Sequence, residues 1–205
     1  MATHEDTVRR LLDRAGRTYA DEAGIKLADK PAPLYRLLVL GVLLSTRISA
    51  NIAVAAAREL RTYGTPRKML DATWQRRVDA LGRAHYVRYD ESTATALGEG
   101  ARLLLDELGG DLRKIRDGDI AGRLRKFPRL GPVGADIFCR EAQAVWPELR
   151  PYLDRKTLDG AERIGLPADA NKLAGLVDGS DLARFSAALV RVSLDKKLAD
   201  QVREG

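Results

Sequence analysis

Apolar residues recur at intervals of three and four along most of the chain, which is the pattern of helices that bury one face. Between residues 6 and 23 the recurring set is Val8, Leu11, Leu12, Ala15 and Tyr19. Residues 34–44 are apolar nearly all round, which indicates a helix buried at the centre of the fold. No run alternates convincingly between apolar and polar positions as a half-buried strand would. The pattern therefore predicts an all-α fold.

Polar caps, glycines and prolines mark where these helices begin and end. Gly24 is expected to end the first helix, and Pro31 and Pro33 are expected to keep residues 25–33 out of a helix. Further helices are predicted over residues 50–63, 74–81, 91–108, 132–146, 155–164, 170–177 and 181–194, with N-caps at Ser49, Thr73, Asp154, Asp169 and Ser180, and shorter helices are predicted after Thr65 and Asp119. The sum is about ten short helices with short connections.

Length and composition narrow the class of protein but not its function. The 205 residues suffice for one large helical domain or two small ones. A net charge of +6 favours a polyanionic partner only weakly, because many basic proteins are simply well solvated. The longest apolar run, residues 37–44, is too short to span a bilayer, and the polar, acidic start does not resemble a signal peptide. We therefore expect a cytoplasmic protein without a membrane partner, associated with the nucleoid if it is bacterial.

The chain offers few residues for a metal site or a covalent cross-link. Cys139 is the single cysteine, so it can form no internal disulfide and cannot by itself hold zinc or an iron–sulfur cluster. Neither His4 nor His85 has a histidine or cysteine neighbour at the spacing of a metal site. We therefore expect no metal-ligating residues and no iron–sulfur cofactor.

The segment from Arg123 to Ile137 has the pattern of a nucleic-acid-binding turn. A basic run leads through a proline into a tight turn at Gly131 and a new helix that opens at Pro132. Gly131 and Gly134 lack a Cβ, so another backbone can approach them closely. The first amides of the new helix have no intrahelical acceptor and can donate to a phosphate. The competing interpretation is an ordinary corner between two helices, with the basic residues forming a solvated face.

This turn resembles a known motif. Residues 127–135, Phe-Pro-Arg-Leu-Gly-Pro-Val-Gly-Ala, resemble the helix–hairpin–helix of the endonuclease III-like DNA glycosylases of the HhH-GPD superfamily, whose pattern is Leu-Pro-Gly-Val-Gly-Arg-Lys-Thr-Ala. Further similarities to that family, in the same order along the chain, are Leu43-Leu44-Ser45-Thr46-Arg47, Thr65-Pro66-Arg67-Lys68-Met69, Trp146-Pro147 and Tyr152-Leu153-Asp154. Together the matches extend over residues 34–166.

The resemblance implies a two-lobed helical fold with the helix–hairpin–helix at about residues 119–146. We expect one lobe of six helices at residues 34–145. The second helical lobe is expected to combine residues 1–33 with residues 146–205.

Departures from the family pattern bear on the chemistry. Val133 occupies the position of the lysine that attacks the sugar C1′ in bifunctional members, which excludes a β-lyase step by that route. Arg129 replaces the first hairpin glycine, and an arginine there costs about 1 kcal/mol if the turn requires a positive φ. Arg47 replaces the glutamine that fills the space left by an extruded base. The four-cysteine loop of the iron–sulfur cluster is missing.

Asp154 is the expected catalytic residue. The resemblance places it at the family's invariant aspartate, which stabilises an oxocarbenium-like sugar and helps a water molecule to attack C1′. The competing role is an N-cap of the following helix, and the two roles are compatible. The expected DNA-binding residues are Arg129, Leu130, Gly131, Val133, Gly134, Arg47 and Lys156. The family also implies a monovalent cation on hairpin carbonyls.

The resemblance implies base-excision DNA repair, and Val133 in place of the lysine makes the expected protein a monofunctional DNA glycosylase, which removes a damaged or mismatched base and leaves an abasic site. The expected partner is damaged double-stranded DNA, bound by a monomer. A non-catalytic DNA-binding protein that retains the hairpin is the second interpretation, and a helical interaction domain without nucleic acid is the third. The loop with His85, Tyr86, Arg88 and Tyr89 is open between stacking on DNA bases and packing against its own domain.

Overall fold

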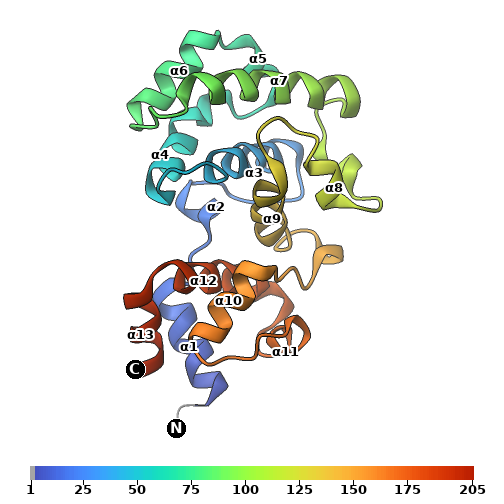
Figure 1. The fold of residues 1–205 in the computed structure, drawn as a ribbon. Helices are drawn as coiled ribbons and strands as arrows, with labels where there is room; N and C mark the ends of the chain where they lie inside the picture. Colours follow the sequence, from blue (N-terminus) through green and yellow to red (C-terminus); the bar gives the residue numbers. More distant parts are fainter. Residues whose placement is uncertain (1–2) are drawn as a thin grey trace. The chain divides into compact units, whose positions relative to one another are not determined.

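The computed structural model describes residues 3–205 and is built from helices and their connections (Figure 1). No strand occurs among these residues, which confirms the all-α prediction. The chain forms two compact units. We call residues 20–138 the hairpin unit, and residues 3–19 together with 139–205 the Asp154 unit. In the part of the chain that the structure describes, no helix is both long enough and apolar enough to cross a membrane.

The hairpin unit is built around one apolar helix. α3 (Pro31–Leu44) has buried side chains around its whole circumference, as its sequence predicts. It packs against α4 (Ala50–Glu59), while α7 (Asp90–Leu108) runs along α5 (Pro66–Asp71) and α6 (Trp74–Arg83) (Figure 1). The remaining elements of the unit are most of α2 (Tyr19–Glu22), the 3-10 turns Leu60–Tyr63 and Leu112–Ile115, α8 (Ile120–Leu124) and the first part of α9 (Gly131–Ala142).

Most helices start at the predicted caps. Side-chain oxygens of six predicted N-caps accept the backbone amide three residues further on, at Ser49, Thr65, Thr73, Asp119, Asp154 and Asp169. α3 begins earlier than expected, because Pro31 and Pro33 lie in its first turn, where a missing N–H costs nothing. α1 (His4–Ala15) ends earlier than expected, because Gly16 closes it by donating its amide to the Leu12 carbonyl.

The Asp154 unit is organised around α12 (Leu182–Leu194). α1, α10 (Arg155–Arg163) and α13 (Lys196–Glu204) pack against it, and α11 (Ala170–Ala174) contributes to the same core. The shared apolar core includes Leu11, Ile164, Leu173, Phe185, Leu189 and Val202. Burial of this face of α12 therefore holds together helices from both ends of the sequence.

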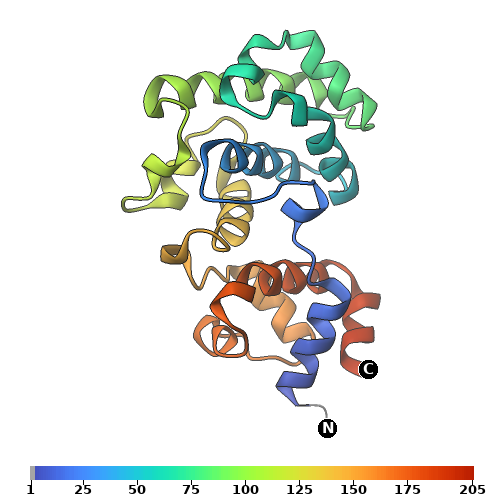
Figure 2. The ribbon, with the colours of Figure 1, turned by 180° about the vertical axis from the view of Figure 1, so that it is seen from behind.

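Two local contacts fix the packing of the Asp154 unit. α10 approaches α12 closely because Gly160 has no side chain, and a Cβ there would overlap the Leu189 carbonyl oxygen. α1 and α13 lie side by side in both ribbon views, and Arg10 Nε donates to the Val202 carbonyl at 2.9 Å (Figure 2).

The boundaries of the two units differ from the expected ones at 34 and 145. Residues 20–33 fall in the hairpin unit, where Arg58 Nε donates to the Glu22 carbonyl at 2.7 Å and Arg36 Nη2 donates to the Gly24 carbonyl at 3.2 Å. Residues 139–145 fall in the Asp154 unit. Contacts between residues far apart in the sequence define these boundaries, and composition along the chain does not reveal them.

Candidate functional site

The turn between α8 and α9 has the backbone of a tight and strained corner. α8 ends at Leu124 and α9 begins at Gly131, and between them the Leu130 amide donates to the Phe127 carbonyl at 3.2 Å. Arg129 and Gly131 both lie in the left-handed region, with φ of 61° and 58°. For the arginine this conformation costs about 1 kcal/mol, so the surrounding contacts must hold it.

Helix α3 supplies those contacts. A Cβ on Gly41 would lie 3.3 Å from the Gly134 carbonyl oxygen, and a Cβ on Gly134 would lie 3.3 Å from the Gly41 carbonyl oxygen. The buried side chain of Leu130 also covers Gly134, because a Cβ there would lie 2.7 Å from Leu130 Cδ1. The Ser45 hydroxyl, which follows α3, reaches the Arg129 carbonyl at 3.0 Å and shares its proton with an α3 carbonyl 2.7 Å away.

Two backbone amides at the start of α9 are available to a ligand. The Gly134 amide donates to the Leu130 carbonyl at 2.9 Å, and Pro132 has no N–H. Within residues 3–205, the amides of Gly131 and Val133 have no backbone acceptor. The Val133 side chain is 59% exposed, so this edge of the turn meets solvent. Leu130 and Gly134 are buried, and their amides already donate to the carbonyls of Phe127 and Leu130.

Three segments that are distant in sequence meet at this turn. Tyr89, in the loop before α7, has the guanidinium carbons of Arg88 and Arg129 at 5.2 and 5.7 Å from its ring centroid. The Thr46 hydroxyl lies 2.9 Å from the Tyr86 hydroxyl, which joins the turn after α3 to the same loop. Arg47 is exposed in that turn. We call residues 45–47, 85–89 and 129–134 the hairpin cluster.

The loop of candidate base-stacking residues divides into a buried part and an exposed part. Tyr86 is fully buried, and its hydroxyl lies 2.9 Å from that of Thr46 and 3.4 Å from that of Thr93. Base stacking is therefore wrong for Tyr86, because its hydroxyl has partners inside the unit and its ring belongs to the core. The exposed edge of the loop consists of His85, Val87 and Arg88.

Asp154 caps α10 and is also bound by an arginine. Its Oδ1 accepts the Thr157 amide at 3.2 Å, which confirms the capping role. Its Oδ2 accepts Arg140 Nη1 at 2.6 Å, and the side chains of Asp154 and Arg140 are only 13% and 10% exposed. Each carboxylate oxygen therefore has one donor, and the negative charge is paired where water has little access.

The segment that leads to Asp154 is tied to the end of α9. Gln143 is fully buried, its Nε2 donates to the Tyr152 carbonyl at 3.1 Å, and its Oε1 accepts the Tyr152 amide at 2.9 Å. Arg150 Nε donates to the Gln143 carbonyl at 2.7 Å, and its Nη2 donates to the Ala144 carbonyl at 2.9 Å. The backbone that carries Asp154 is thus fixed at two points.

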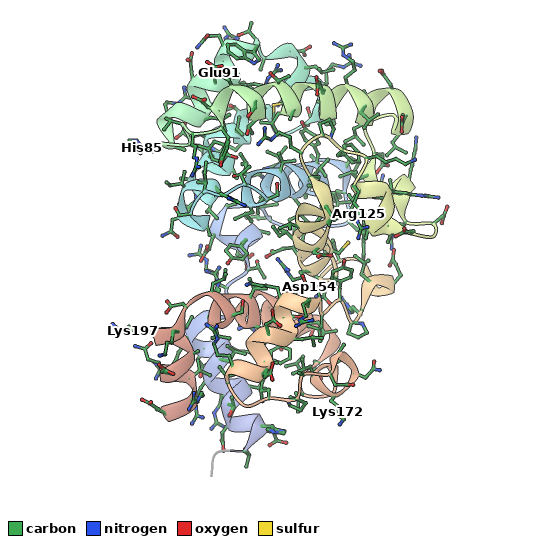
Figure 3. All side chains as sticks on the ribbon, viewed as in Figure 1. His85, Glu91, Arg125, Asp154, Lys172 and Lys197 are labelled. Atoms are coloured by element: carbon green, nitrogen blue, oxygen red, sulfur yellow. The ribbon has the colours of Figure 1, made fainter. Side chains whose placement is uncertain are left out.

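Lys156, the remaining predicted DNA contact, is half-buried in the first turn of α10. Its neighbour Arg155 is exposed and pairs with Asp159 at 2.9 Å, and the hydrogen bond to that carboxylate raises the pKa of Arg155. Lys156 belongs to the Asp154 unit, with Asp154 at the start of the same helix (Figure 3). The other predicted DNA-binding residues belong to the hairpin unit, as does Arg125, which precedes the turn (Figure 3).

The cofactor predictions bear on backbone carbonyls and on Cys139. The Arg129 carbonyl accepts the Ser45 hydroxyl, and the carbonyls of Phe127 and Leu130 accept backbone amides. A carbonyl has two lone pairs, so these oxygens keep the capacity to bind a monovalent cation, which stays a prediction. Cys139 is fully buried. Across the described residues, no group of three or more His, Cys, Asp or Glu side chains is arranged to hold a metal ion.

Sequence reasoning missed the partners of Asp154. Arg140 lies in the last turn of α9 and Gln143 directly follows that helix; Arg140 binds the Asp154 side chain, and Gln143 binds the backbone that precedes Asp154. Their closeness in the sequence was a usable signal, but the sequence does not show which distant segment the two residues meet. The geometry thus provides a turn with two available amides in one unit and a rigidly held carboxylate in the other.

Comparisons with known proteins identify the fold. A scan against protein-family models and a search of curated proteins find no match. Among solved structures, the chain is similar to a trapped endonuclease III–DNA covalent intermediate, an estranged-adenine complex, with a TM-score of 0.52 and 15% identity. It is also similar to a non-covalent endonuclease III–DNA complex, with a TM-score of 0.53 and 14% identity. Each alignment covers 93% of this chain and 85% of the other chain. The protein therefore has the helical HhH-GPD fold of endonuclease III.

Proposed function

We propose that this protein acts in base-excision repair, binding damaged double-stranded DNA as a monomer and removing a base without cutting the strand. The observation that supports this best is the hairpin cluster, in which two available amides stand beside exposed arginines at positions 47, 88 and 129. The two solved structures that share the fold contain DNA, which supports DNA as the substrate.

The hairpin would bind the DNA backbone. The amides of Gly131 and Val133 lie at the positive end of the α9 dipole, where a phosphate is stabilised. Arg129 adds a full charge beside them. Contacts of this kind position the duplex without reading its sequence, so the affinity should fall steeply with salt. Arg47 can supply charge and stacking surface where a nucleotide leaves the duplex.

Asp154 would support the bond-breaking step. The base departs with the electron pair of the N-glycosidic bond, which leaves an oxocarbenium-like sugar. The Asp154 carboxylate offsets that positive charge, and a water molecule adds to C1′ and loses a proton, which the departed base takes up, so that an abasic site and a free base result. Because Val133 has no amine, no Schiff base forms on the hairpin and the strand stays intact.

A non-catalytic DNA-binding protein is the second candidate function, and one observation favours it. Asp154 already accepts hydrogen bonds from the Thr157 amide and from Arg140, so its charge is partly neutralised before any substrate binds. Such a carboxylate can serve the fold alone.

A lesion panel separates the two candidates. Duplexes with oxidised, alkylated, deaminated or mismatched bases are incubated with the protein and analysed with and without alkali. We expect strand breaks only after alkali, and we expect Asp154→Asn to abolish them while DNA affinity changes by less than about threefold. Strand cutting without alkali would contradict a monofunctional reaction. Salt-dependent DNA binding with no base released from any duplex would establish the non-catalytic candidate.

A further inference from the structure

We propose that Arg140 is a positioning residue that fixes the Asp154 carboxylate in the orientation that stabilises a positively charged sugar. This inference rests on the proposed function, because it assigns Arg140 a role in that reaction. The role of Arg140 is separate from helix capping, because the cap of α10 requires only the bond from the Thr157 amide to one oxygen of the Asp154 carboxylate.

The environment of the pair distinguishes it from a surface ion pair. Arg140 and Asp154 are 10% and 13% exposed at a distance of 2.6 Å, whereas Arg155 and Asp159, on the same helix as Asp154, are 90% and 44% exposed. A buried pair gains little net stability, because the loss of hydration offsets most of the attraction between the charges. A role in orienting the carboxylate accounts for the pair better than a role in stability.

The hydrogen bonds define one orientation of the carboxylate. The Thr157 amide holds Oδ1 and Arg140 Nη1 holds Oδ2, so rotation about the side chain would break one bond or the other. A charge-assisted bond of this length is among the stronger hydrogen bonds in proteins. Gln143, three residues after Arg140, fixes the backbone of Tyr152 by donating to its carbonyl and accepting its amide. The side chain is thus positioned by Arg140 of α9 and the backbone by Gln143 directly after that helix, and catalytic groups are sensitive to small displacements.

The test compares two duplexes that differ only in charge at the abasic sugar. One contains a pyrrolidine, which is cationic and resembles the oxocarbenium-like sugar, and the other contains a neutral tetrahydrofuran of the same shape. The ratio of their dissociation constants reports the alignment of the Asp154 carboxylate, because contacts to phosphates cancel. We expect the wild-type protein to prefer the pyrrolidine duplex by at least about tenfold. We expect Arg140→Gln to reduce that preference by about fivefold or more, with little change in affinity for the tetrahydrofuran duplex.

Matched variants separate positioning from charge and from folding. Arg155→Gln removes the same charge one residue from Asp154, but from the exposed pair, and is expected to keep the preference. Arg140→Lys keeps the charge and is expected to retain most of the preference. If Arg140→Gln does not fold, the preference of Arg140→Lys tests the positioning role instead. Circular dichroism monitors the fold of each variant.

The outcomes distinguish this inference from the proposed function. A preference in Arg140→Gln equal to or above the wild-type value, or an equal loss in Arg155→Gln, would overturn the positioning role and leave the proposed function standing. If Arg140→Gln is unfolded, a complete loss of preference in folded Arg140→Lys would overturn it. A wild-type protein with no preference for the pyrrolidine duplex would overturn the catalytic role of Asp154, and the role of Arg140 with it.

Discussion

Gly41 of α3 and Gly134 of α9 face each other so closely that a Cβ on either would lie 3.3 Å from the carbonyl oxygen of the other. The two positions are not equivalent, because a Cβ on Gly134 would also lie 2.7 Å from Leu130 Cδ1. Leu130 is buried in the turn and has little room to move. The hairpin therefore depends more on the glycine of α9 than on that of α3.

Gly134→Ala is expected to lower the free energy of unfolding by about 1–3 kcal/mol, because Leu130 must shift within a packed core. DNA affinity should fall as well, since the displaced turn carries the Gly131 and Val133 amides. Urea unfolding and fluorescence anisotropy measure the two effects. Gly41→Ala serves as the control and should cost less. Equal costs for the two alanine variants would contradict the asymmetry.

Replacement of Arg129 should separate backbone strain from DNA contact. Glycine relieves the strain of the left-handed conformation and alanine does not, so Arg129→Gly should be about 1 kcal/mol more stable than Arg129→Ala. Both variants lose the same charge, and the slope of log affinity against log salt should fall by about 1 in each. Thermal unfolding and binding at several salt concentrations provide the measurements. Equal stability of the two variants would mean that the turn is not strained at residue 129.

Val133→Lys should add a covalent step to the proposed reaction. The side chain at this position is 59% exposed, so a lysine fits without disturbing the core. Its amine can attack the sugar C1′ and form a Schiff base, which borohydride reduces to a stable protein–DNA adduct. We expect the adduct with Val133→Lys and none with the wild-type protein or with Val133→Met, as seen by gel electrophoresis. Trapping of the wild-type protein would show that another amine acts as nucleophile.

Asp111 should stabilise the hairpin unit at neutral pH but not in acid. It accepts the Arg113 amide at 3.0 Å and pairs with the Arg113 guanidinium at 2.7 Å. The hydrogen bond from the Arg113 side chain lowers the pKa of Asp111 below its ordinary 3.8. A lowered folded-state pKa stabilises the fold above the unfolded-state pKa, and that contribution is lost as the pH falls through the folded-state pKa.

Asp111→Asn keeps the cap and removes the charge. The variant is therefore expected to be less stable than wild type by up to about 1 kcal/mol near neutral pH, and the difference should be lost as the pH falls below the ordinary 3.8 and through the lowered folded-state pKa. Urea unfolding across this range measures the difference. A difference that does not change with pH would assign the effect to packing instead of charge.

Local features of the fold could be predicted from sequence to the extent that they depend on neighbouring residues. The caps at Ser49, Thr73 and Asp169 were predicted because a short polar side chain before an apolar repeat can satisfy the first amides of a helix. Ser180 was wrong as the cap of α12, because a 3-10 turn over Gly179–Asp181 shifts the start to Leu182. α13 was missed, although Asp195 caps it through the Leu198 amide.

The candidate site could be predicted only in part, because some of its contacts join residues that are far apart in the sequence. The hairpin is a local sequence, so its glycines and basic residues indicate a turn that can meet a phosphate. The pairing of Arg140 with Asp154 is not local: 14 positions separate the two residues, and the intervening chain must first be folded back by Gln143 and Arg150. The burial of Tyr86 likewise depends on Thr46, 40 positions away.

The two units also differ in when their helices are synthesised during translation. The hairpin unit is one uninterrupted stretch, so its core can close as soon as residue 138 has emerged. The Asp154 unit takes α1 from the start of the sequence and α12 from near its end. Since α1 precedes the hairpin unit but buries its apolar face against α12, which follows that unit, α1 must wait until the whole hairpin unit has been synthesised. The unit that holds Asp154 therefore acquires its structure after the hairpin unit during translation.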